Sequence, residues 1–280
     1  YFNRMISGNT REDGSKCGFG GCYYNRPSDR SDDFNEISAR FGVTTTFEEL
    51  NYFAQISLGF RPPQINEAYR LQKKQNVTDL DSETLTMIEI GSRFDRDTVN
   101  GSVSFYKSKK KNSIFRDAEN FIVDNGKTDH EGIELSLNWL ISSNNTVSSN
   151  ITYGNHRYDF ETDTSMREKI RIGNKIDTSP KLMANLIWDL NLRNDSSISF
   201  EIEYMSSYYT DAANLHEYDG HTLYHARFNK NLSTSLKGFV RVDNVFDKAY
   251  AERADFNAFG GDRYFPGLPR EFYVGLEYTF

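Results

Sequence analysis

The side chains best suited to chemistry in this sequence are its two cysteines and five histidines. Cys17 and Cys22 enclose the segment Gly-Phe-Gly-Gly, and no histidine precedes His130. Zinc would need two further ligands close to the cysteines, so a zinc site is disfavoured. A small disulfide loop in an oxidising compartment fits better, and a pair of free thiols is the alternative. The sequence therefore predicts a disulfide between Cys17 and Cys22.

The histidines do not form a catalytic pattern. His221 and His225 have the spacing of a helical metal-binding pair, but they lie on a predicted strand, where residues four apart are about 13 Å apart. The sequence has no Gly-rich phosphate loop, Cys-x-x-Cys pair or nucleophile elbow. We therefore expect no enzymatic activity, no cofactor and no metal site.

Two short segments are candidates for ligand contact. Lys109 and Lys110 belong to the only basic cluster, which is predicted to stand where a strand leaves for a long loop. This cluster is either a contact for anionic lipopolysaccharide or an anionic ligand, or a solvated strand end. Tyr208 and Tyr209 lie in an aromatic, small-polar loop. They could stack on a ligand, or they could belong to a girdle of aromatic residues at a membrane surface.

Composition excludes several classes of protein. The 280 residues are 37% hydrophobic and 14% aromatic, with a net charge of −7. Disordered chains are poor in aromatic residues, and an acidic chain lacks the basic footprint of a nucleic-acid binder. No run of 18 apolar residues could form a membrane-spanning helix, whereas the strands of a membrane β-barrel need apolar residues on one face only.

The elements that must position these side chains are strands. Residues 272–280 alternate strictly, with Phe272, Val274, Leu276, Tyr278 and Phe280 on one face. Alternation with a period of two indicates a strand that has one apolar face. The same pattern predicts strands at 36–47, 50–60, 85–94, 98–107, 133–141, 146–154, 182–190, 198–204, 221–230 and 235–244. With a stub at 1–6, which reads as the end of a strand, about twelve strands are predicted; we expect that the chain begins inside a larger protein.

The predicted connections alternate between short and long. Short polar links lie at 46–49, 95–98, 142–146, 193–196 and 231–234. Long links cover 7–35, 61–83, 108–129, 155–178, 205–220 and 245–270. This alternation is typical of an outer-membrane barrel with short periplasmic turns and long extracellular loops, and it predicts a periplasmic C-terminus.

Charged side chains on the other face of the strands favour a wet barrel lumen. A soluble sandwich would bury them without partners, at a high cost in free energy, whereas a wide barrel exposes them to water. A soluble β-protein with half-buried sheets is the alternative. The side chains concerned are Glu134, Asn138, Glu201, Glu203, Arg241 and Asp243.

Five motifs, in order from residue 60 to residue 280, resemble those of TonB-dependent outer-membrane receptors. They are Phe60-Arg61-Pro62-Pro63 with Glu67-Ala68-Tyr69, the run 81–91, His130-Glu131-Gly132-Ile133-Glu134-Leu135, Val242-Asp243-Asn244-Val245-Phe246-Asp247-Lys248-Ala249-Tyr250, and Arg263-Tyr264-Phe265-Pro266-Gly267-Leu268-Pro269-Arg270 before the last strand. The resemblance implies a 22-stranded barrel filled by an N-terminal plug. Residues 1–280 would then be the C-terminal half of the barrel, and the plug would not be in this chain.

The resemblance also implies a function and partners. It implies active uptake of a scarce nutrient through the outer membrane, most often a ferric siderophore or other iron complex, energised by the TonB system through the missing plug. Cobalamin, oligosaccharides and a passive porin-type channel are the alternatives; haem is disfavoured because no histidine lies between Arg61 and Asp81. Arg61 joins the ligand-loop candidates. Phe280 resembles the terminal aromatic residue read by the barrel-assembly machinery, and it also suits the girdle at the membrane surface.

Overall fold

The computed structural model describes residues 24–25, 32–68, 71–72, 80–116, 121–162 and 169–279. The predicted disulfide between Cys17 and Cys22, the terminal Phe280 and the predicted stub at 1–6 lie outside these residues, so these expectations stay predictions. The helix α1 (Ile65–Ala68) has four residues, and no helix within the described ranges is long and apolar enough to cross a membrane.

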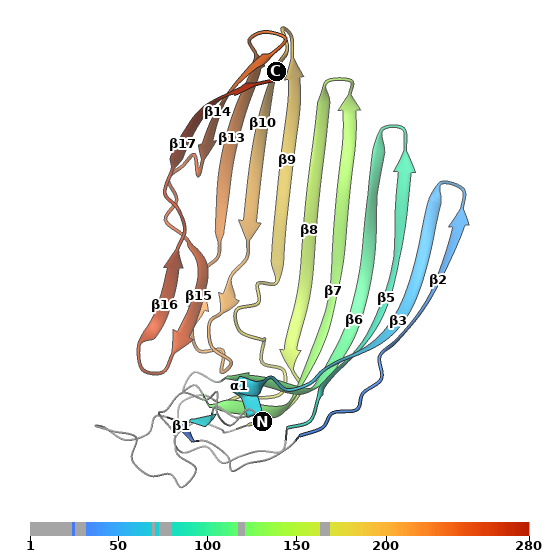
Figure 1. Ribbon diagram of the computed structural model, residues 1–280, viewed down its shortest axis with the longest axis vertical. Coiled ribbons are helices and arrows are strands. Elements are labelled where there is room, and N and C mark those ends of the chain that lie inside the picture. The colour runs from blue at the N-terminus through green and yellow to red at the C-terminus, as the bar shows by residue number, and fades with distance from the viewer. Residues whose placement is uncertain are drawn as a thin grey trace.

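More than half of the described residues form one antiparallel sheet of eleven strands (Figure 1). Each strand pairs with the strands of this sheet that come directly before and after it along the chain. All eleven strands that alternation predicts within the described residues are present. In chain order they are β2 (Ala39–Phe47), β3 (Leu50–Arg61), β5 (Glu83–Arg96), β6 (Val99–Arg116), β7 (Ile122–Ser142), β8 (Asn145–Tyr158), β9 (Leu182–Leu192), β10 (Ser196–Met205), β13 (His221–Asn231), β14 (Leu236–Asp243) and β17 (Glu271–Tyr278).

The register of the strands places the apolar side chains on one face, as predicted. Phe105 on β6 lies opposite Ile133 on β7, which in turn lies opposite Tyr153 on β8. Farther along the sheet, Trp188 lies opposite Phe200, and their ring centroids are 5.8 Å apart. Many of these side chains are exposed, so the structure has a broad apolar face that no part of the described chain covers. Such a face is stable when its surroundings are apolar.

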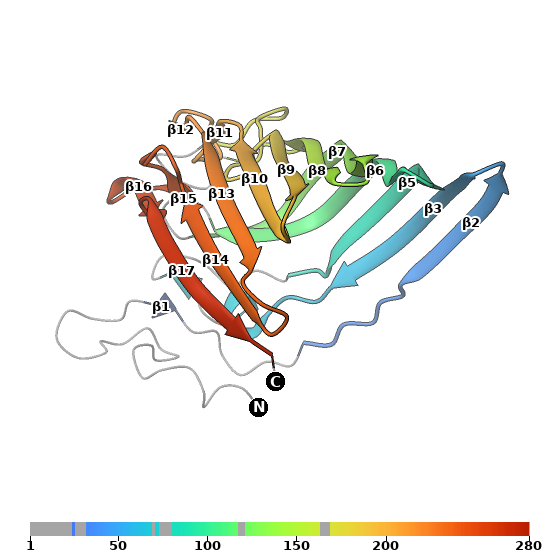
Figure 2. The ribbon, with the colours of Figure 1, turned by 90° about the horizontal axis from the view of Figure 1, so that it is seen from above.

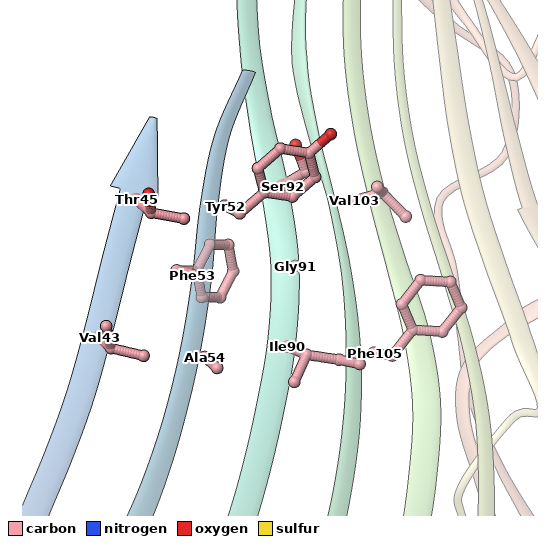
Figure 3. Close-up of a pocket in the computed structure, with 10 residues that line it drawn as sticks. All are labelled: Val43, Thr45, Tyr52, Phe53, Ala54, Ile90, Gly91, Ser92, Val103 and Phe105. Atoms are coloured by element: carbon pink, nitrogen blue, oxygen red, sulfur yellow. The ribbon is translucent and has the colours of Figure 1, made fainter. Parts of the chain in front are cut away.

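The sheet bends into an open arc (Figure 2). Within the described chain, β2 and β17 each pair on one side only, so the barrel is not closed. From left to right, Figure 1 runs from β17 to β2, whereas Figure 3 runs from Val43 on β2 to Phe105 on β6. The two figures therefore show opposite faces of the sheet. The apolar side chains stand on the convex face, which is the face seen in Figure 3. The concave face is therefore the polar one, as expected of a barrel lumen.

The two ends of the sheet differ. Short turns join β2 to β3, β5 to β6, β7 to β8, β9 to β10 and β13 to β14 at one end, which is the upper end in Figure 1. Residues with positive φ close several of these turns, such as Glu48 and Asn194. The long connections all lie at the other end, which we call the long-connection end. The predicted separation of short and long links is confirmed.

The long links contain more structure than predicted. The segment 108–129 was expected to be a loop, but β6 runs on to Arg116 and β7 begins at Ile122. Their pairing continues through two irregularities between Lys110 and Phe115. Smaller pairs follow in other links: β1 (Tyr24–Asn25) with β4 (Leu71–Gln72), β11 (Tyr208–Tyr209) with β12 (Glu217–Tyr218), and β15 (Ala251–Asn257) with β16 (Gly261–Pro266).

The buried hydrophobic clusters lie among the long connections and not in the middle of the sheet. Packed connections can hold side chains in fixed positions, as a binding surface requires. The three clusters are Leu80, Ile114 and Ile122; Tyr208, Tyr218, Ala251 and Ala254; and Tyr158, Ile170 and Ala212.

Candidate ligand-binding surface

The apolar face ends sharply on the side of the long connections. Beyond Phe105 and Ile133, the next pair on that face is Lys107 and Glu131, whose Nζ and Oε2 atoms are 3.4 Å apart. Asn155 on β8 donates a hydrogen bond to Glu131 Oε1 at 3.1 Å. Lys107, Glu131 and Asn155 form a charged row, which marks where an apolar environment would give way to water. Residues beyond the charged row form the candidate ligand-binding surface.

The basic cluster lies within β6, which corrects the prediction that it stands where a strand leaves for a loop. The reason is that β6 and β7 continue to pair past the cluster. Lys109 Nζ lies 3.3 Å from Asp129 Oδ1, and Lys110 Nζ lies 2.8 Å from Glu83 Oε1. The candidate ligand contacts Lys109 and Lys110 are thus each paired with a carboxylate.

Arg61, another candidate, joins three segments. It follows the last aromatic residue of β3, and its guanidinium binds Glu83 at the start of β5 and Glu67 on α1, the latter at 3.0 Å. Burial raises the pKa of Glu83, but hydrogen bonds from Arg61, from the Ile114 N–H and from Lys110 outweigh burial and lower it overall. Hydrogen bonds to Glu83 and Glu67 raise the pKa of Arg61. These ion pairs fix the geometry of the surface beside β3.

Tyr208 is buried, and its hydroxyl is engaged with the backbone of another connection. The Ala254 N–H donates to the Tyr208 hydroxyl at 2.8 Å, and that hydroxyl donates to the Ala254 carbonyl at 3.2 Å. Tyr218 makes the same two contacts with Ala251, at 3.0 and 3.2 Å. We call this pair of contacts the tyrosine clamp. It holds β15 against β11 and β12.

Tyr209 has different surroundings. It is half-buried, and the Lys175 ammonium lies 5.3 Å from the centre of its ring. Nearby, His216 stacks on Phe256 with a centroid distance of 3.8 Å, and its Nδ1 lies 3.1 Å from Asp262 Oδ1. The connections at this end therefore carry several aromatic rings whose positions are set by contacts between different loops.

A pocket of about 420 Å³ opens on the polar face of β5–β8, at the level of the charged row. His130 and His156 lie in it as a directly opposed pair, with their Nδ1 atoms 2.9 Å apart. Glu134, which the sequence placed in the lumen, also lines this pocket.

Two opposed glycines make room for two of the rings that line this pocket, those of His156 and Tyr106. Gly132 and Gly154 face each other on β7 and β8. A Cβ atom on Gly154 would lie 2.4 Å from His156 Nε2, and one on Gly132 would lie 2.5 Å from the Tyr106 hydroxyl oxygen. The His156 and Tyr106 side chains therefore lie over glycine backbone, and larger residues at these positions would displace them.

The sequence alone does not pair His130 with His156. The hairpin of β7 and β8 turns at residues 143–144, so equal steps outward from the turn would bring residue 130 opposite residue 157. An irregularity between Leu140 and Ser142 shifts the register by one residue and brings His130 opposite His156. Within the described residues, no group of three or more His, Cys, Asp or Glu is placed to hold a metal ion. The pocket offers instead two imidazoles, with carboxylates farther along its wall.

A second depression lies on the opposite, apolar face (Figure 3). It has a volume of about 490 Å³, and Tyr52, Ala54, Ile90 and Phe105 are among its lining residues. It has no charged lining residue, so it does not suit a polar ligand. We therefore place the candidate ligand-binding surface on the polar face and the long connections.

Comparison with solved structures gives the same architecture. The siderophore receptor PiuA from Acinetobacter baumannii superposes with a TM-score of 0.70 at 17% identity, covering 85% of this chain and 35% of PiuA. The ferric-catecholate import receptor Fiu from E. coli K12 gives 0.70 at 17% identity, with 94% and 39% covered. The ferric yersiniabactin uptake receptor FyuA from Yersinia pestis gives 0.66 at 16% identity, with 85% and 36% covered. The chain thus spans little more than a third of the length of these structures.

Comparison by sequence agrees with this architecture. No match was found among curated proteins. A family model described as "TonB dependent receptor-like, beta-barrel" matches residues 8–245, which include ten of the eleven strands of the sheet. With a two-faced antiparallel sheet in place and most of its strands inside that match, the chain belongs to the family of TonB-dependent receptor β-barrels.

Proposed function

We propose that this chain is part of an outer-membrane receptor that actively takes up a ferric siderophore or another iron complex. The observation that carries the proposal is the sheet itself, apolar on its convex face and polar on its concave face, within a match to the receptor family. The three solved relatives are named for siderophores or for ferric complexes, which supports an iron complex as cargo.

Transport requires parts of the protein that lie outside this chain. We propose that the remaining strands close the barrel between the free edges of β2 and β17, and that a plug domain fills it and contacts the TonB system. The apolar face would contact outer-membrane lipid. The charged row, with Lys109 and Lys110 beyond it, would lie near lipopolysaccharide. Phe280 would be recognised by the barrel-assembly machinery.

We propose that the long-connection end is extracellular, and that the short turns and the C-terminal end of β17 are periplasmic. Two features support this orientation. Outer-membrane barrels have short periplasmic turns and long extracellular loops. The packed clusters, the histidine pocket and the charged row all lie toward one end, which is the end that would meet an incoming ligand.

The five candidate contacts differ in how freely they could reach a ligand. Lys109 is 57% exposed, and Tyr209 is half-buried, which supports direct contact. Arg61 and Lys110 are about two-thirds buried and share Glu83, and the hydroxyl of Tyr208 is engaged with Ala254. We propose that these three shape the surface on which Lys109 and Tyr209 meet the ligand.

Growth on defined iron sources tests the proposal. Cells that lack the gene should fail to grow on one ferric siderophore as the sole iron source, and the full-length gene should restore growth. Restoration should also require an intact TonB system. Equal growth with and without the gene on every iron complex tried, together with a defect in cobalamin or oligosaccharide uptake, would assign the receptor to that other cargo.

The passive porin-type channel is separated by conductance. The purified full-length receptor in a planar bilayer should remain closed to ions, because the plug is proposed to fill its lumen. Steady conductance without ligand, together with uptake that does not need the TonB system, would support a channel.

A further inference from the structure

We propose that His130 and His156 together bind a divalent transition metal ion, with Cu²⁺ bound most tightly, as two neighbouring ligands of a site whose other positions are open to water. The proposal goes beyond the uptake function and does not depend on which cargo the receptor carries. It concerns a ligand pair that the sequence analysis did not expect.

The separation of the two ring nitrogens fits a chelate. Metal–nitrogen distances to histidine are about 2.0–2.1 Å, so two nitrogens at a right angle around one metal lie about 2.9 Å apart. The Nδ1 atoms of His130 and His156 are 2.9 Å apart. Right-angled nitrogen ligands are typical of tetragonal Cu²⁺ and Ni²⁺ sites. The separation of the two nitrogens can stay as it is, while both rings rotate to aim their Nδ1 lone pairs at a metal that lies beside the line joining the nitrogens.

The backbone places the two histidines for this purpose. Directly opposed residues on antiparallel strands have Cβ atoms about 4.5–5.5 Å apart, so both imidazoles reach a common point. His156 owes its orientation to Gly154, because any Cβ there would lie 2.4 Å from Nε2 of its ring. The register of β8 and the glycine at position 154 therefore set the position of His156.

A hydrogen bond orients the other ligand, His130. Nε2 of His130 lies 2.8 Å from the Thr128 hydroxyl oxygen. When Nε2 donates to that oxygen, Nδ1 of His130 carries a lone pair directed at His156. A partner on the far nitrogen is the usual support of a metal-binding histidine. In the metal-free protein the Nδ1–H of His156 donates to Nδ1 of His130. When the metal binds, Nδ1 of His156 loses this proton and Nε2 of the same ring takes one up, so that both Nδ1 lone pairs are available to the metal.

The type of ligand explains which metal ions are preferred. Imidazole nitrogen suits Cu²⁺, Ni²⁺ and Zn²⁺, whereas Mg²⁺ and Ca²⁺ prefer oxygen ligands, and affinity rises along the first-row series to Cu²⁺. The pocket also contains Met87, Glu89 and Glu134, but not as part of a three-ligand cluster. Two protein ligands leave the other coordination positions of the metal open to water or to donor atoms of a chelating molecule.

The test uses the purified full-length receptor, titrated with CuSO₄ in a non-coordinating buffer and followed by electron paramagnetic resonance and calorimetry. We expect one Cu²⁺ per receptor with nitrogen hyperfine structure. His130→Ala and His156→Ala should each weaken binding at least about 10-fold, because even losing the partner of a ligating histidine costs 10–100-fold. Gly154→Ala should weaken it too, although both histidines remain.

Matched controls isolate the pair. His216→Ala, in the connection between β11 and β12, should leave binding unchanged, and so should the double variant Cys17→Ser with Cys22→Ser, which removes the thiols as copper ligands. Heat-modifiable migration in gels confirms that each variant is folded. The proposal is overturned if the receptor binds no Cu²⁺, if binding survives either histidine substitution unchanged, or if MgCl₂ competes as well as ZnCl₂. These results do not depend on the growth experiment, so the two proposals fail separately.

Discussion

Glu83 shows how one carboxylate can organise a binding surface. It is 3% exposed, yet it stays ionised because Arg61, Lys110 and the Ile114 N–H surround it. A buried charge is tolerated only when it is paired and hydrogen-bonded, and removing one partner leaves the others uncompensated. The start of β5, the end of β3 and the extension of β6 therefore depend on a single side chain.

Glu83→Gln should loosen this region. The amide can still accept from Ile114, but it loses the charge that holds Arg61 and Lys110. We expect the local free energy of opening to fall by about 1–3 kcal/mol, below the 3–5 kcal/mol of a fully buried pair because both cations are about one-third exposed. Hydrogen exchange at 61–68 and 108–116 measures the change. Glu131→Gln, in an exposed pair with Lys107, should leave exchange there unaltered.

The same carboxylate predicts a pH dependence. The pKa of Glu83 is lower in the folded protein than the usual 4.5, so the folded form holds its proton less tightly than the unfolded form does. Its stabilising contribution is complete above pH 4.5 and is lost as the pH falls through the lower folded value. Exchange of the Ile114 amide, corrected for intrinsic rates, should accelerate below pH 4.5 in the wild type and change less in Glu83→Gln.

Side chains on strands were more predictable than side chains in connections. Glu134 lies on the polar face, as predicted, because alternation fixes the face of every strand residue. The pairing of His130 with His156 depends in addition on a one-residue irregularity near the turn of β7 and β8, which alternation does not reveal. By contrast, the contact between Tyr208 and Ala254 joins two connections that have no repeating pattern, and nothing in the sequence relates them. Arg61 and Glu83 lie directly opposite each other on β3 and β5, but the long link between these strands leaves their register undetermined by the sequence.

At the scale of elements, alternation predicts the strands where one face is uniformly apolar and misses them where neither face is. Residues 133–141 alternate, and the strand predicted from them ends one residue before the end of β7. Residues 122–129 belong to the same strand but lack a regular apolar face, and the sequence therefore predicts them as part of a loop. Alternation reflects the surroundings of a strand and stops at the charged row. The hydrogen bonds between β6 and β7 continue past that row.

The tyrosine clamp predicts coupling between connections. Tyr208→Phe removes the partner of both the N–H and the carbonyl of Ala254, which is fully buried. Leaving buried backbone groups unpaired costs about 1–3 kcal/mol. The hairpin of β15 and β16 should therefore exchange amide hydrogens faster, at Ala254 above all.

Tyr209→Phe provides the matched control for the clamp. Its hydroxyl has no hydrogen-bond partner within the described ranges, so this variant should exchange like the wild type at Ala254. Equal exchange in Tyr208→Phe and Tyr209→Phe would show that packing, and not the hydroxyl, holds the hairpin.

At the scale of the whole molecule, the arrangement of connections predicts which parts are accessible from outside the cell. A protease added to intact cells should cut within 155–178 or 245–270, or within 7–35, which lies largely outside the described residues. It should spare the turns at 95–98 and 193–196. Cuts at these turns in sealed cells, with the long links intact, would reverse the proposed orientation. Permeabilised cells supply the control, because both ends are then accessible.

The end of the chain tests the membrane assignment. In a soluble sheet, deletion of Phe280 would remove one ring and cost at most about 1–3 kcal/mol. In an outer-membrane barrel it would remove the proposed assembly signal, so the full-length protein should be degraded or insert poorly. Phe280→Asp should have the same effect and Phe280→Trp very little, as judged by the amount of protein in isolated outer membranes. Normal amounts of both damaging variants would exclude the signal role.

Pairing between successive strands of the large sheet has a consequence for how receptors of this architecture can diversify. Each long connection closes a loop between two strands that are already neighbours. The entropy of closing a flexible loop grows only with the logarithm of its length, so doubling a connection costs about 0.6 kcal/mol. Insertions and exchanges at this end therefore leave the strand register intact. New ligand preferences can arise by grafting connections, while the sheet is inherited unchanged.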